Sequence, residues 1–341
     1  MKRILACSLI AAAAAALAAP QRAGDIPVAG PVRWDYVWLD PASHRLYVAH
    51  STQVDIIDTD RRQVVAQLAP TPGVHGAVAA TDLHRIFTSN GADDSLGVFD
   101  LATGKPVQTV AVGKGPDAIA YDPLSRRVFT FNGRSSDVTV VDADSLKVLA
   151  VSVPVGGRPE YAVGDGNGHI YFNVENTSEI AVLDARSMTV VRRYGLAPCE
   201  EPSGLAIDPH RRLYSVCDNG LLVVSDPDRG RVIGQADIGR GPDGVAWMDG
   251  KAYSANGADG TISVVAETSP GRFKTIETVT TALGARTIAA DPQRHELYLP
   301  TADFPPQPPA SAASGRRPPA TPGTFRVLVV REPDGAANPA E

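Results

Sequence analysis

Seven polar residues recur along the chain at a nearly constant interval, and each stands at the start of a similar apolar segment. They are Asp35, His75, Asp117, Glu160, Ser203, Asp243 and Arg286. Successive members are 40, 42, 43, 43, 40 and 43 residues apart. Four carboxylates, a histidine and an arginine brought to one place could share protons, hold a cation or bind a polar ligand. The chemistry therefore depends on whether the fold gathers them.

The segment from residue 117 to residue 160 displays the repeating unit most clearly. It holds four runs rich in Val, Ile, Phe, Tyr and Ala, which cover residues 118–121, 127–131, 137–141 and 148–155. Turn-forming pairs such as Asp122-Pro123 and Asn132-Gly133 separate them. Short β-prone runs between turn formers predict four antiparallel strands. One such sheet cannot bury both of its apolar faces, so it needs a copy on either side.

A second strand recurs in phase with the first in all seven units, beginning at positions 45, 85, 127, 169, 212, 251 and 296. A four-stranded unit that repeats at this period is a propeller blade. The sequence therefore predicts an all-β, seven-bladed β-propeller of four-stranded antiparallel blades over residues 26–330. The seventh unit stops after its third strand, at residues 325–330. We expect the spare segment 26–29 to complete blade seven, because closing the ring removes an exposed sheet edge.

The N-terminal residues have the pattern of a secretory signal peptide. Lys2 and Arg3 precede a continuous apolar run over residues 4–18, and Ala16-Leu17-Ala18 fits the small-x-small rule for cleavage before Ala19. Cys7 lies ahead of most of the apolar run, so we interpret it as part of this signal peptide. The sequence predicts a periplasmic or secreted protein. No later stretch approaches the ~18 apolar residues that a spanning helix needs.

Two further segments stand outside the repeat. Residues 304–323 form a proline-rich insertion between strands two and three of blade seven. Proline donates no backbone hydrogen bond, so this segment should be a surface loop. It is either a tolerated insertion or an arm that docks onto a ligand or partner. Residues 331–341 are polar and rich in Pro, Gly and Ala, which predicts a disordered tail.

The third strand of five blades ends in an aspartate, namely Asp58, Asp100, Asp142, Asp184 and Asp226. An aspartate side chain can accept a hydrogen bond from its own downstream backbone and so stabilise a turn. We therefore assign these five aspartates to structure rather than chemistry.

The repeat resembles the YVTN-repeat, or YncE-like, family of bacterial β-propellers. The resemblance rests on Tyr47-Val-Ala-His50, Phe87-Thr-Ser-Asn90, Phe129-Thr-Phe-Asn132 and Tyr253-Ser-Ala-Asn256, together with Val138-Thr-Val-Val-Asp142 and the stretch from Thr109 to Asp117. It extends over about residues 26–330. Blades four, five and seven depart from the pattern, with Val174, Cys217 and Thr301 in place of the asparagine. The resemblance implies an exported propeller and leaves its chemistry open.

In a propeller, the loop that enters strand one and the loop that follows strand two lie on the same face. We therefore expect the seven recurring residues to ring one mouth of the central channel, with Asn90, Asn132 and Asn256 farther out on that face. A concave polar mouth is the first place to look for a ligand. Asp117, Glu160 and Asp243 form the candidate metal site, and their oxygen ligands suit Ca²⁺ or Mg²⁺. Arg286 should pair with Asp243 or Asp35.

Several classes of protein are disfavoured. The sequence has no G-x-S-x-G nucleophile elbow, no phosphate-binding loop, no H-E-x-x-H zinc helix and no C-x-x-C-H haem site. A formal net charge of −6 disfavours a nucleic-acid partner. We expect a monomeric, non-catalytic protein that binds a small molecule, a peptide or a partner protein at the channel mouth. The alternatives are a metal-assisted lactonase or esterase that uses the acidic residues, and a single-stranded nucleic-acid binder.

Cys199 and Cys217 are the cysteines that remain after the signal peptide. Cys199 lies in the loop that enters strand one of blade five, and Cys217 ends strand two of the same blade. Both should lie on the face of the channel mouth. An even cysteine number in an oxidising compartment predicts a disulfide, although two buried free thiols are the alternative.

Overall fold

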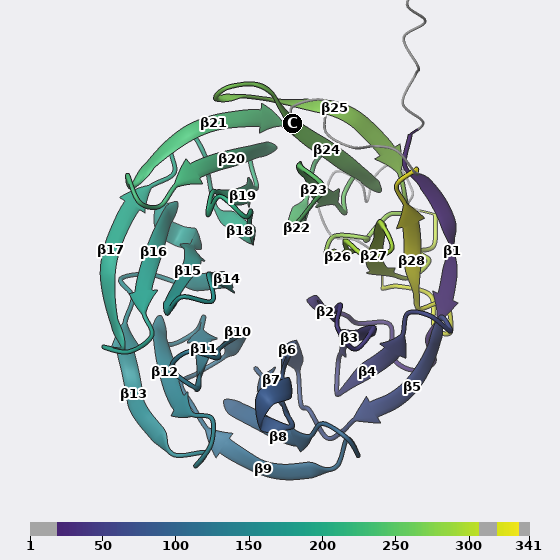
Figure 1. The fold of residues 1–341 in the computed structure, drawn as a ribbon. Helices are drawn as coiled ribbons and strands as arrows, with labels where there is room; N and C mark the ends of the chain where they lie inside the picture. Colours follow the sequence, from purple (N-terminus) through teal and green to yellow (C-terminus); the bar gives the residue numbers. More distant parts are fainter. Residues whose placement is uncertain (1–18, 307–318, 334–341) are drawn as a thin grey trace, which may run out of the picture.

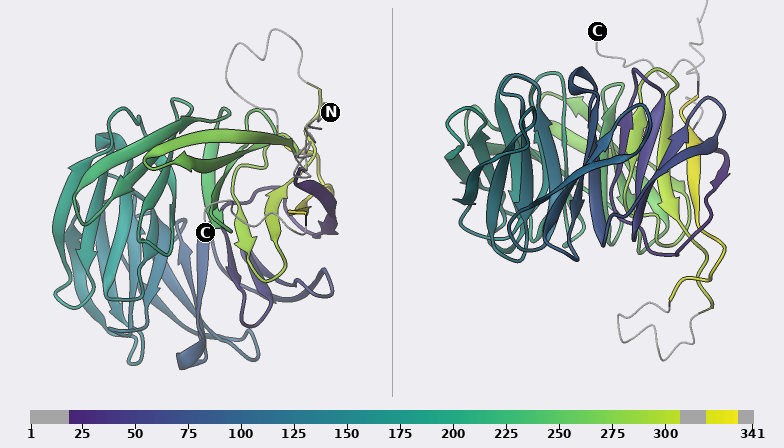
Figure 2. Two further views of the ribbon diagram at one scale, coloured as in Figure 1. Left: turned by 45° about the horizontal axis from the view of Figure 1, so that its top comes forward. Right: turned by 90° about the horizontal axis from the view of Figure 1, so that it is seen from below.

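The computed structural model describes residues 19–306 and 319–333. These residues form seven four-stranded antiparallel sheets, arranged as blades around a central axis (Figure 1). Seen from the side, the blades make a disc (Figure 2). The described residues contain no α-helix, only the short 3-10 turns η1 (Thr81–Leu83) and η2 (Glu175–Thr177). The predicted seven-bladed propeller is confirmed.

Blades one to four follow one another along the chain. Blade one comprises β2 (Val37–Asp40), β3 (Arg45–His50), β4 (Gln53–Asp58) and β5 (Gln63–Leu68). Blade two comprises β6 (Val74–Ala80), β7 (Arg85–Asn90), β8 (Ser95–Asp100) and β9 (Pro106–Ala111). Blade three comprises β10 (Pro116–Asp122), β11 (Arg127–Asn132), β12 (Asp137–Asp142) and β13 (Val148–Pro154). Blade four comprises β14 (Pro159–Gly164), β15 (His169–Val174), β16 (Glu179–Asp184) and β17 (Thr189–Gly195).

The remaining blades complete the ring. Blade five comprises β18 (Pro202–Ile207), β19 (Leu213–Cys217), β20 (Leu221–Asp226) and β21 (Arg231–Asp237). Blade six comprises β22 (Pro242–Met248), β23 (Lys251–Asn256), β24 (Thr261–Ser269) and β25 (Arg272–Thr280). Blade seven comprises β26 (Ala289–Asp291), β27 (Glu296–Thr301), β28 (Arg326–Arg331) and, from the other end of the chain, β1 (Gln21–Pro27). In every blade the first of these strands lies nearest the axis (Figure 1).

β1 closes the ring as the outermost strand of blade seven. It pairs with β28 from Gln21 opposite Arg331 to Pro27 opposite Arg326. The closing strand is confirmed, but it begins five residues before the predicted segment 26–29. The first half of β1 is polar and has no alternating hydrophobic pattern, so the sequence did not reveal it as a strand. Backbone pairing with β28 holds it at the surface. Ile26 supplies the apolar anchor and is fully buried.

Seven apolar clusters form the core, and each one fills the space between two neighbouring blades. Alternation along a strand explains this arrangement, because successive side chains point to opposite faces of a sheet. In β3, Leu46 and Val48 pack toward blade seven, whereas Tyr47 and Ala49 pack toward blade two. Each blade therefore buries both of its faces against copies of itself.

The five predicted turn aspartates accept the backbone hydrogen bonds expected of them. The backbone N–H groups of Arg61, Thr103, Ser145, Ser187 and Arg229 donate to the aspartate three residues earlier, over 2.6–3.0 Å. These contacts hold the turns between the third and fourth strands of blades one to five.

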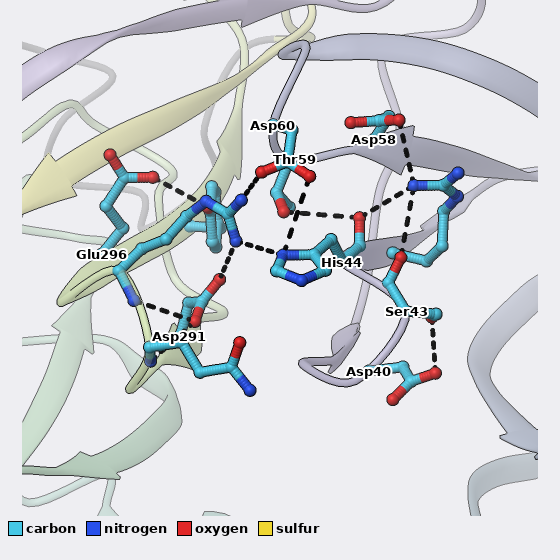
Figure 3. Close-up of polar contacts among 12 residues, drawn as sticks. Asp40, Ser43, His44, Asp58, Thr59, Asp60, Asp291 and Glu296 are labelled. Atoms are coloured by element: carbon cyan, nitrogen blue, oxygen red, sulfur yellow. Dashed lines mark hydrogen bonds and ion pairs between the residues drawn. The ribbon is translucent and has the colours of Figure 1, made fainter.

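A polar network joins blades seven and one at the closure seam (Figure 3). The Arg62 guanidinium donates to the Glu296 carboxylate over 2.7 Å and to the backbone oxygen of Ala23 in β1 over 2.8 Å. Arg294 contacts both His44 and Asp60 of blade one, and it lies 3.3 Å from Asp291 of its own blade. Side chains of the first blade thus hold the last blade and its borrowed strand.

A disulfide joins Cys199, which precedes β18, to Cys217 at the end of β19. Their Cα atoms lie 5.4 Å apart, a separation that suits such a bond. The two cysteines belong to the same blade and both side chains are buried. The disulfide therefore ties the entry loop of blade five to its second strand.

Three segments lie outside the described residues. These are the predicted signal peptide at residues 1–18, residues 307–318 of the proline-rich insertion, and most of the predicted tail, residues 334–341. The described start of the insertion packs onto the propeller, where the ring centroids of Phe304 and Trp34 are 6.3 Å apart. The search for membrane-spanning helices in the described part of the chain found no helix of sufficient length and hydropathy.

Candidate ligand site at the channel mouth

The structure gathers the seven recurring residues at the entry to the innermost strands. In blades two to six the residue at this position lies where strand one loses register with strand two, at a β-bulge or similar irregularity. A bulge changes the direction of a side chain relative to the regular ladder. All seven side chains are partly exposed, and the values for Asp35, His75, Asp117, Asp243 and Arg286 range from 20% to 34%.

Three neighbouring blades contribute a His–carboxylate group to the mouth. The Nδ1 atom of His75 lies 2.5 Å from Oδ2 of Asp35 and 3.2 Å from Oδ1 of Asp117. Burial by itself would lower the pKa of His75, but the hydrogen bond to Asp35 and the charges of both carboxylates outweigh it and raise that pKa. The two acids beside His75 therefore favour its protonated form.

Arg286 lies near Asp35 as well, and it also contacts Asp243. Its Nε donates to Asp243 over 2.6 Å, and its Nη2 lies 3.6 Å from Asp35 and donates to the backbone oxygen of Trp34 over 3.0 Å. The guanidinium also lies over the Trp34 ring, 5.8 Å from its centroid. Arg286 therefore pairs with both of the aspartates that the sequence offered as alternatives, and it links blades six, seven and one.

Glu160 is held from across the channel. The hydroxyl of Tyr36 in blade one donates to Oε1 of Glu160 in blade four over 2.7 Å. The Tyr36 ring meets the edge of Tyr161, with centroids 4.7 Å apart. These two tyrosines meet across the axis, directly beneath the ring of polar residues.

Carboxyl groups at the mouth outnumber the cationic side chains that pair with them. Burial, followed by repulsion from Asp117, raises the pKa of Glu160 to about 9. Burial and the neighbouring acids raise the pKa of Asp117 to about 7, although His75 opposes this change. Burial also raises the pKa of Asp243, against the pull of Arg286. At neutral pH, Glu160 retains its proton and Asp117 is partly protonated.

The predicted metal site of Asp117, Glu160 and Asp243 is not assembled in this arrangement. Glu160 is bonded to Tyr36 and Asp243 to Arg286. Among the described residues, the group whose potential ligand atoms all lie within 4.8 Å of one another is Asp35, His75 and Asp117. Sequence position alone could not reveal which of the recurring side chains come close together, because distances across a channel depend on side-chain direction. One imidazole nitrogen and two carboxylate oxygens, rather than three carboxylates, would face a cation there.

The three asparagines predicted on the mouth face do not reach it, which corrects that assignment. Asn90, Asn132 and Asn256 are at most 2% exposed. Each donates to Ser, Thr or Asp side chains on the third strand of its own blade. Asn132, for example, donates to Asp137 over 2.8 Å and to Thr139 over 3.0 Å. Their amides stabilise the junction between strands two and three and are not accessible to a ligand.

Ser203 has a structural contact at the mouth, because its hydroxyl donates to the backbone oxygen of Pro242 over 3.2 Å. The sequence interpretation also missed Tyr36 and Tyr161, which follow the recurring polar position. The signal was present: at this second position the other blades carry the small residues Gly76, Ala118, Gly204, Gly244 and Thr287. Two large aromatic rings among five small residues indicate a filled section of the channel.

Comparison with known proteins establishes the fold and no closer relationship. No family model and no curated protein matches the sequence. The structure is similar to the RRP9 WD40 repeats, with a TM-score of 0.76, 8% identity, and coverage of 93% of this chain and 100% of that chain. A chain of the mitotic checkpoint complex gives a TM-score of 0.75 at 13% identity, with coverage of 97% and 98%.

Hydrazine synthase from Kuenenia stuttgartiensis gives a TM-score of 0.67 at 15% identity, covering 80% of this chain and 94% of that chain. At such identities the likeness is one of architecture alone. The chain is thus a seven-bladed β-propeller with WD40-like structural neighbours.

Proposed function

We propose that this protein is an exported, YncE-like binding propeller whose channel mouth receives a cationic group of its ligand. The YVTN-type repeats and the signal-like segment at residues 1–18 support the first part of the proposal. The ligand is a small molecule, a peptide or a segment of a partner protein that presents an ammonium or guanidinium group. Binding rather than catalysis is favoured, because the polar side chains at the mouth are engaged with one another.

The gathering of four carboxyl groups at one channel mouth carries this proposal, and the raised pKa values of Asp117, Glu160 and Asp243 agree with it. Each carboxyl pays a desolvation cost when it ionises, and each repels its neighbours. Arg286 and His75 offset part of this charge. A ligand cation placed among the carboxyls would favour their ionised forms, so its binding should release protons. An anionic ligand would be repelled by the same carboxyl groups.

Calorimetric titration with spermidine at pH 6 and pH 8.5 tests the proposal. We expect tighter binding at pH 8.5, since Asp117 and Glu160 are more fully ionised there. Net proton release should accompany binding at a pH where these carboxyls are still protonated in the free protein. Glu160→Gln should reduce the pH dependence. Glu277→Gln is the matched control, because its carboxyl also has a raised pKa but lies on the outermost strand β25. Binding of citrate but not spermidine would contradict the proposal.

A metal-assisted hydrolase is the second candidate function. It is supported by the proximity of potential ligand atoms in Asp35, His75 and Asp117. Oxygen ligands suit Ca²⁺ or Mg²⁺, whereas an imidazole ligand also suits Zn²⁺. Elemental analysis of the purified protein and hydrolysis of a lactone before and after EDTA treatment would separate this function from simple binding. A metal-free protein without EDTA-sensitive hydrolysis would exclude it.

Export is tested independently of the ligand. Cell fractionation should place the protein outside the cytoplasm, and intact-mass measurement should give a chain that begins at Ala19. A full-length cytoplasmic chain would contradict export and leave the binding proposal to the titration.

A further inference from the structure

A cavity of about 270 Å³ lies along the channel beyond the polar mouth. Its lining comes mainly from the second to fifth positions of the innermost strands in blades one to four, with Ile207 of blade five. Tyr36 and Tyr161 line the end nearest the mouth. Tyr121 and Gly164 lie at the other end, near the turns that connect strand one to strand two. The cavity is therefore separated from the polar ring by the two tyrosines.

The chemistry of this cavity differs from that of the mouth, because no charged residue lines it. Trp38, Tyr121 and the tyrosine pair supply aromatic surface, while the other lining residues are small or aliphatic. The inner edge of each strand one has no strand partner, so its backbone N–H and C=O groups face the channel. An apolar wall with a few convergent polar groups is typical of a site for a small organic ligand.

The tyrosine hydroxyls around the cavity differ in their hydrogen bonding. Tyr36 donates to Glu160, and Tyr121 donates to Asp82 over 2.8 Å. The Tyr161 hydroxyl has no protein partner among the described residues, and burial raises the pKa of Tyr161 to about 12 with no other contribution. An unpartnered hydroxyl in a part-buried setting can donate to a ligand. The bound molecule should therefore carry a hydrogen-bond acceptor.

We propose that this cavity is a second binding site, for an uncharged planar aromatic molecule that carries one carbonyl-type acceptor. The ligand would pack against Trp38 and Tyr121 and accept a hydrogen bond from Tyr161. The site goes beyond the proposed cation site at the mouth and does not depend on it. A charged ligand would be disfavoured, because nothing in the lining compensates for the cost of removing its charge from water.

Coumarin is a suitable probe because it is uncharged, bicyclic and carries a lactone carbonyl. We expect saturable binding by calorimetry and by saturation-transfer NMR. Coumarin-3-carboxylate, which is anionic at neutral pH, should bind at least ~10-fold more weakly. Tyr161→Phe should weaken coumarin binding several-fold through loss of its hydroxyl.

Gly164→Phe is designed to fill the cavity. A Cβ at residue 164 would meet only the backbone oxygen of His169, at 3.9 Å, so a Cβ is accommodated there without a clash. Gly195→Phe is its matched control, since Gly195 lies on the outermost strand of the same blade with nothing within 4 Å. We expect Gly164→Phe to reduce coumarin affinity at least ~10-fold and Gly195→Phe to leave it unchanged, with both variants retaining the wild-type melting profile.

Trp38→Leu gives a second test if Gly164→Phe does not fold. It should weaken coumarin binding by about 2–10-fold, the range expected for one lost aromatic contact. Absence of saturable coumarin binding to the wild-type protein would overturn the proposal. Equal affinity in wild type and a folded Gly164→Phe, or equal affinity for the anionic analogue, would overturn it as well.

Discussion

The ionisation of Glu160 depends on residues far from it in the sequence. Tyr36 donates to its carboxyl from the opposite side of the channel, and Asp117 repels its charge from the next blade. Its neighbours in sequence contribute neither effect. The same recurring position therefore yields a neutral acid in blade four and an arginine-paired acid in blade six, where Asp243 meets Arg286.

Replacing Glu160 by glutamine should flatten the pH dependence of stability. The folded-state pKa of about 9 lies above the usual value, so the carboxyl favours folding below about pH 4 and this advantage is lost as pH rises toward 9. Glutamine keeps the acceptor for Tyr36 and cannot ionise. We expect the variant to be more stable than wild type at pH 8, by on the order of 1–3 kcal/mol, and little changed at pH 4. Urea unfolding at both pH values measures this, and parallel stability curves would contradict it.

Replacing Arg286 by methionine should destabilise the propeller because Asp243 and Asp35 lose their shared cation. Removing one partner of a buried ion pair costs about 3–5 kcal/mol. Because Arg286 is 34% exposed, we expect a smaller loss of about 1–3 kcal/mol. The loss should become smaller as the pH is lowered, because protonation of Asp243, whose pKa is raised, removes the charge left without a partner. Arg229→Met is the control: Arg229 is 67% exposed beside Asp226, and an exposed pair contributes about 1 kcal/mol or less. Similar melting shifts in the two variants would argue against a special role for Arg286.

At the scale of the strands, side chains that end one strand stabilise the start of the next. The asparagines at the ends of β7, β11 and β23 donate to the third strands of their blades. Blade five has Cys217 in the equivalent place and uses a covalent bond to Cys199 instead. The same position of the repeat thus joins strand two to strand three in blades two, three and six, and joins strand two to the entry loop of strand one in blade five.

The disulfide should be present in protein purified without reductant and should stabilise it. The Cys199→Ser/Cys217→Ser double variant should lose about 3 kcal/mol, as the chain-entropy account predicts for a loop of this length. Thermal or urea unfolding measures the loss, and addition of a reductant should lower the stability of wild type but leave the variant unchanged. Alkylation and mass spectrometry without reduction should find no free thiol. Two alkylated cysteines in the native sample would contradict the assignment.

At the scale of the whole molecule, stability depends on closure. Each blade buries its faces against two neighbours, so an opened seam exposes the apolar cluster between blades seven and one. β1, the Arg62–Glu296 pair and the contacts of Arg294 all lie at this seam. Closing the ring keeps this apolar cluster buried, and the chain closes it by placing its first strand in its last blade.

Deleting residues 19–27 should therefore destabilise the entire domain rather than fray one end. The deletion exposes the edge of β28 and removes Ile26 from the core. Ile26→Ala is the milder variant, with an expected cost of about 2–4 kcal/mol. Val65→Ala on the outermost strand β5 is its control, because Val65 is 44% exposed and should cost about 0.5 kcal/mol or less. A deletion variant that melts like the wild-type chain would show that β1 does not close the ring.

The sequence by itself determined the number of blades, the closing strand, the turn aspartates and the pairing of Cys199 with Cys217. Each of these follows from a local pattern or from its repetition. Neighbouring residues determine the strand period and the turn chemistry, and the repeat interval gives the length of a blade. Only the tertiary structure decided that Tyr36 meets Glu160, that His75 lies between Asp35 and Asp117, and that Asn132 is buried. These depend on distances across the channel and on loss of solvent, which arise only when residues from separate blades meet around one axis.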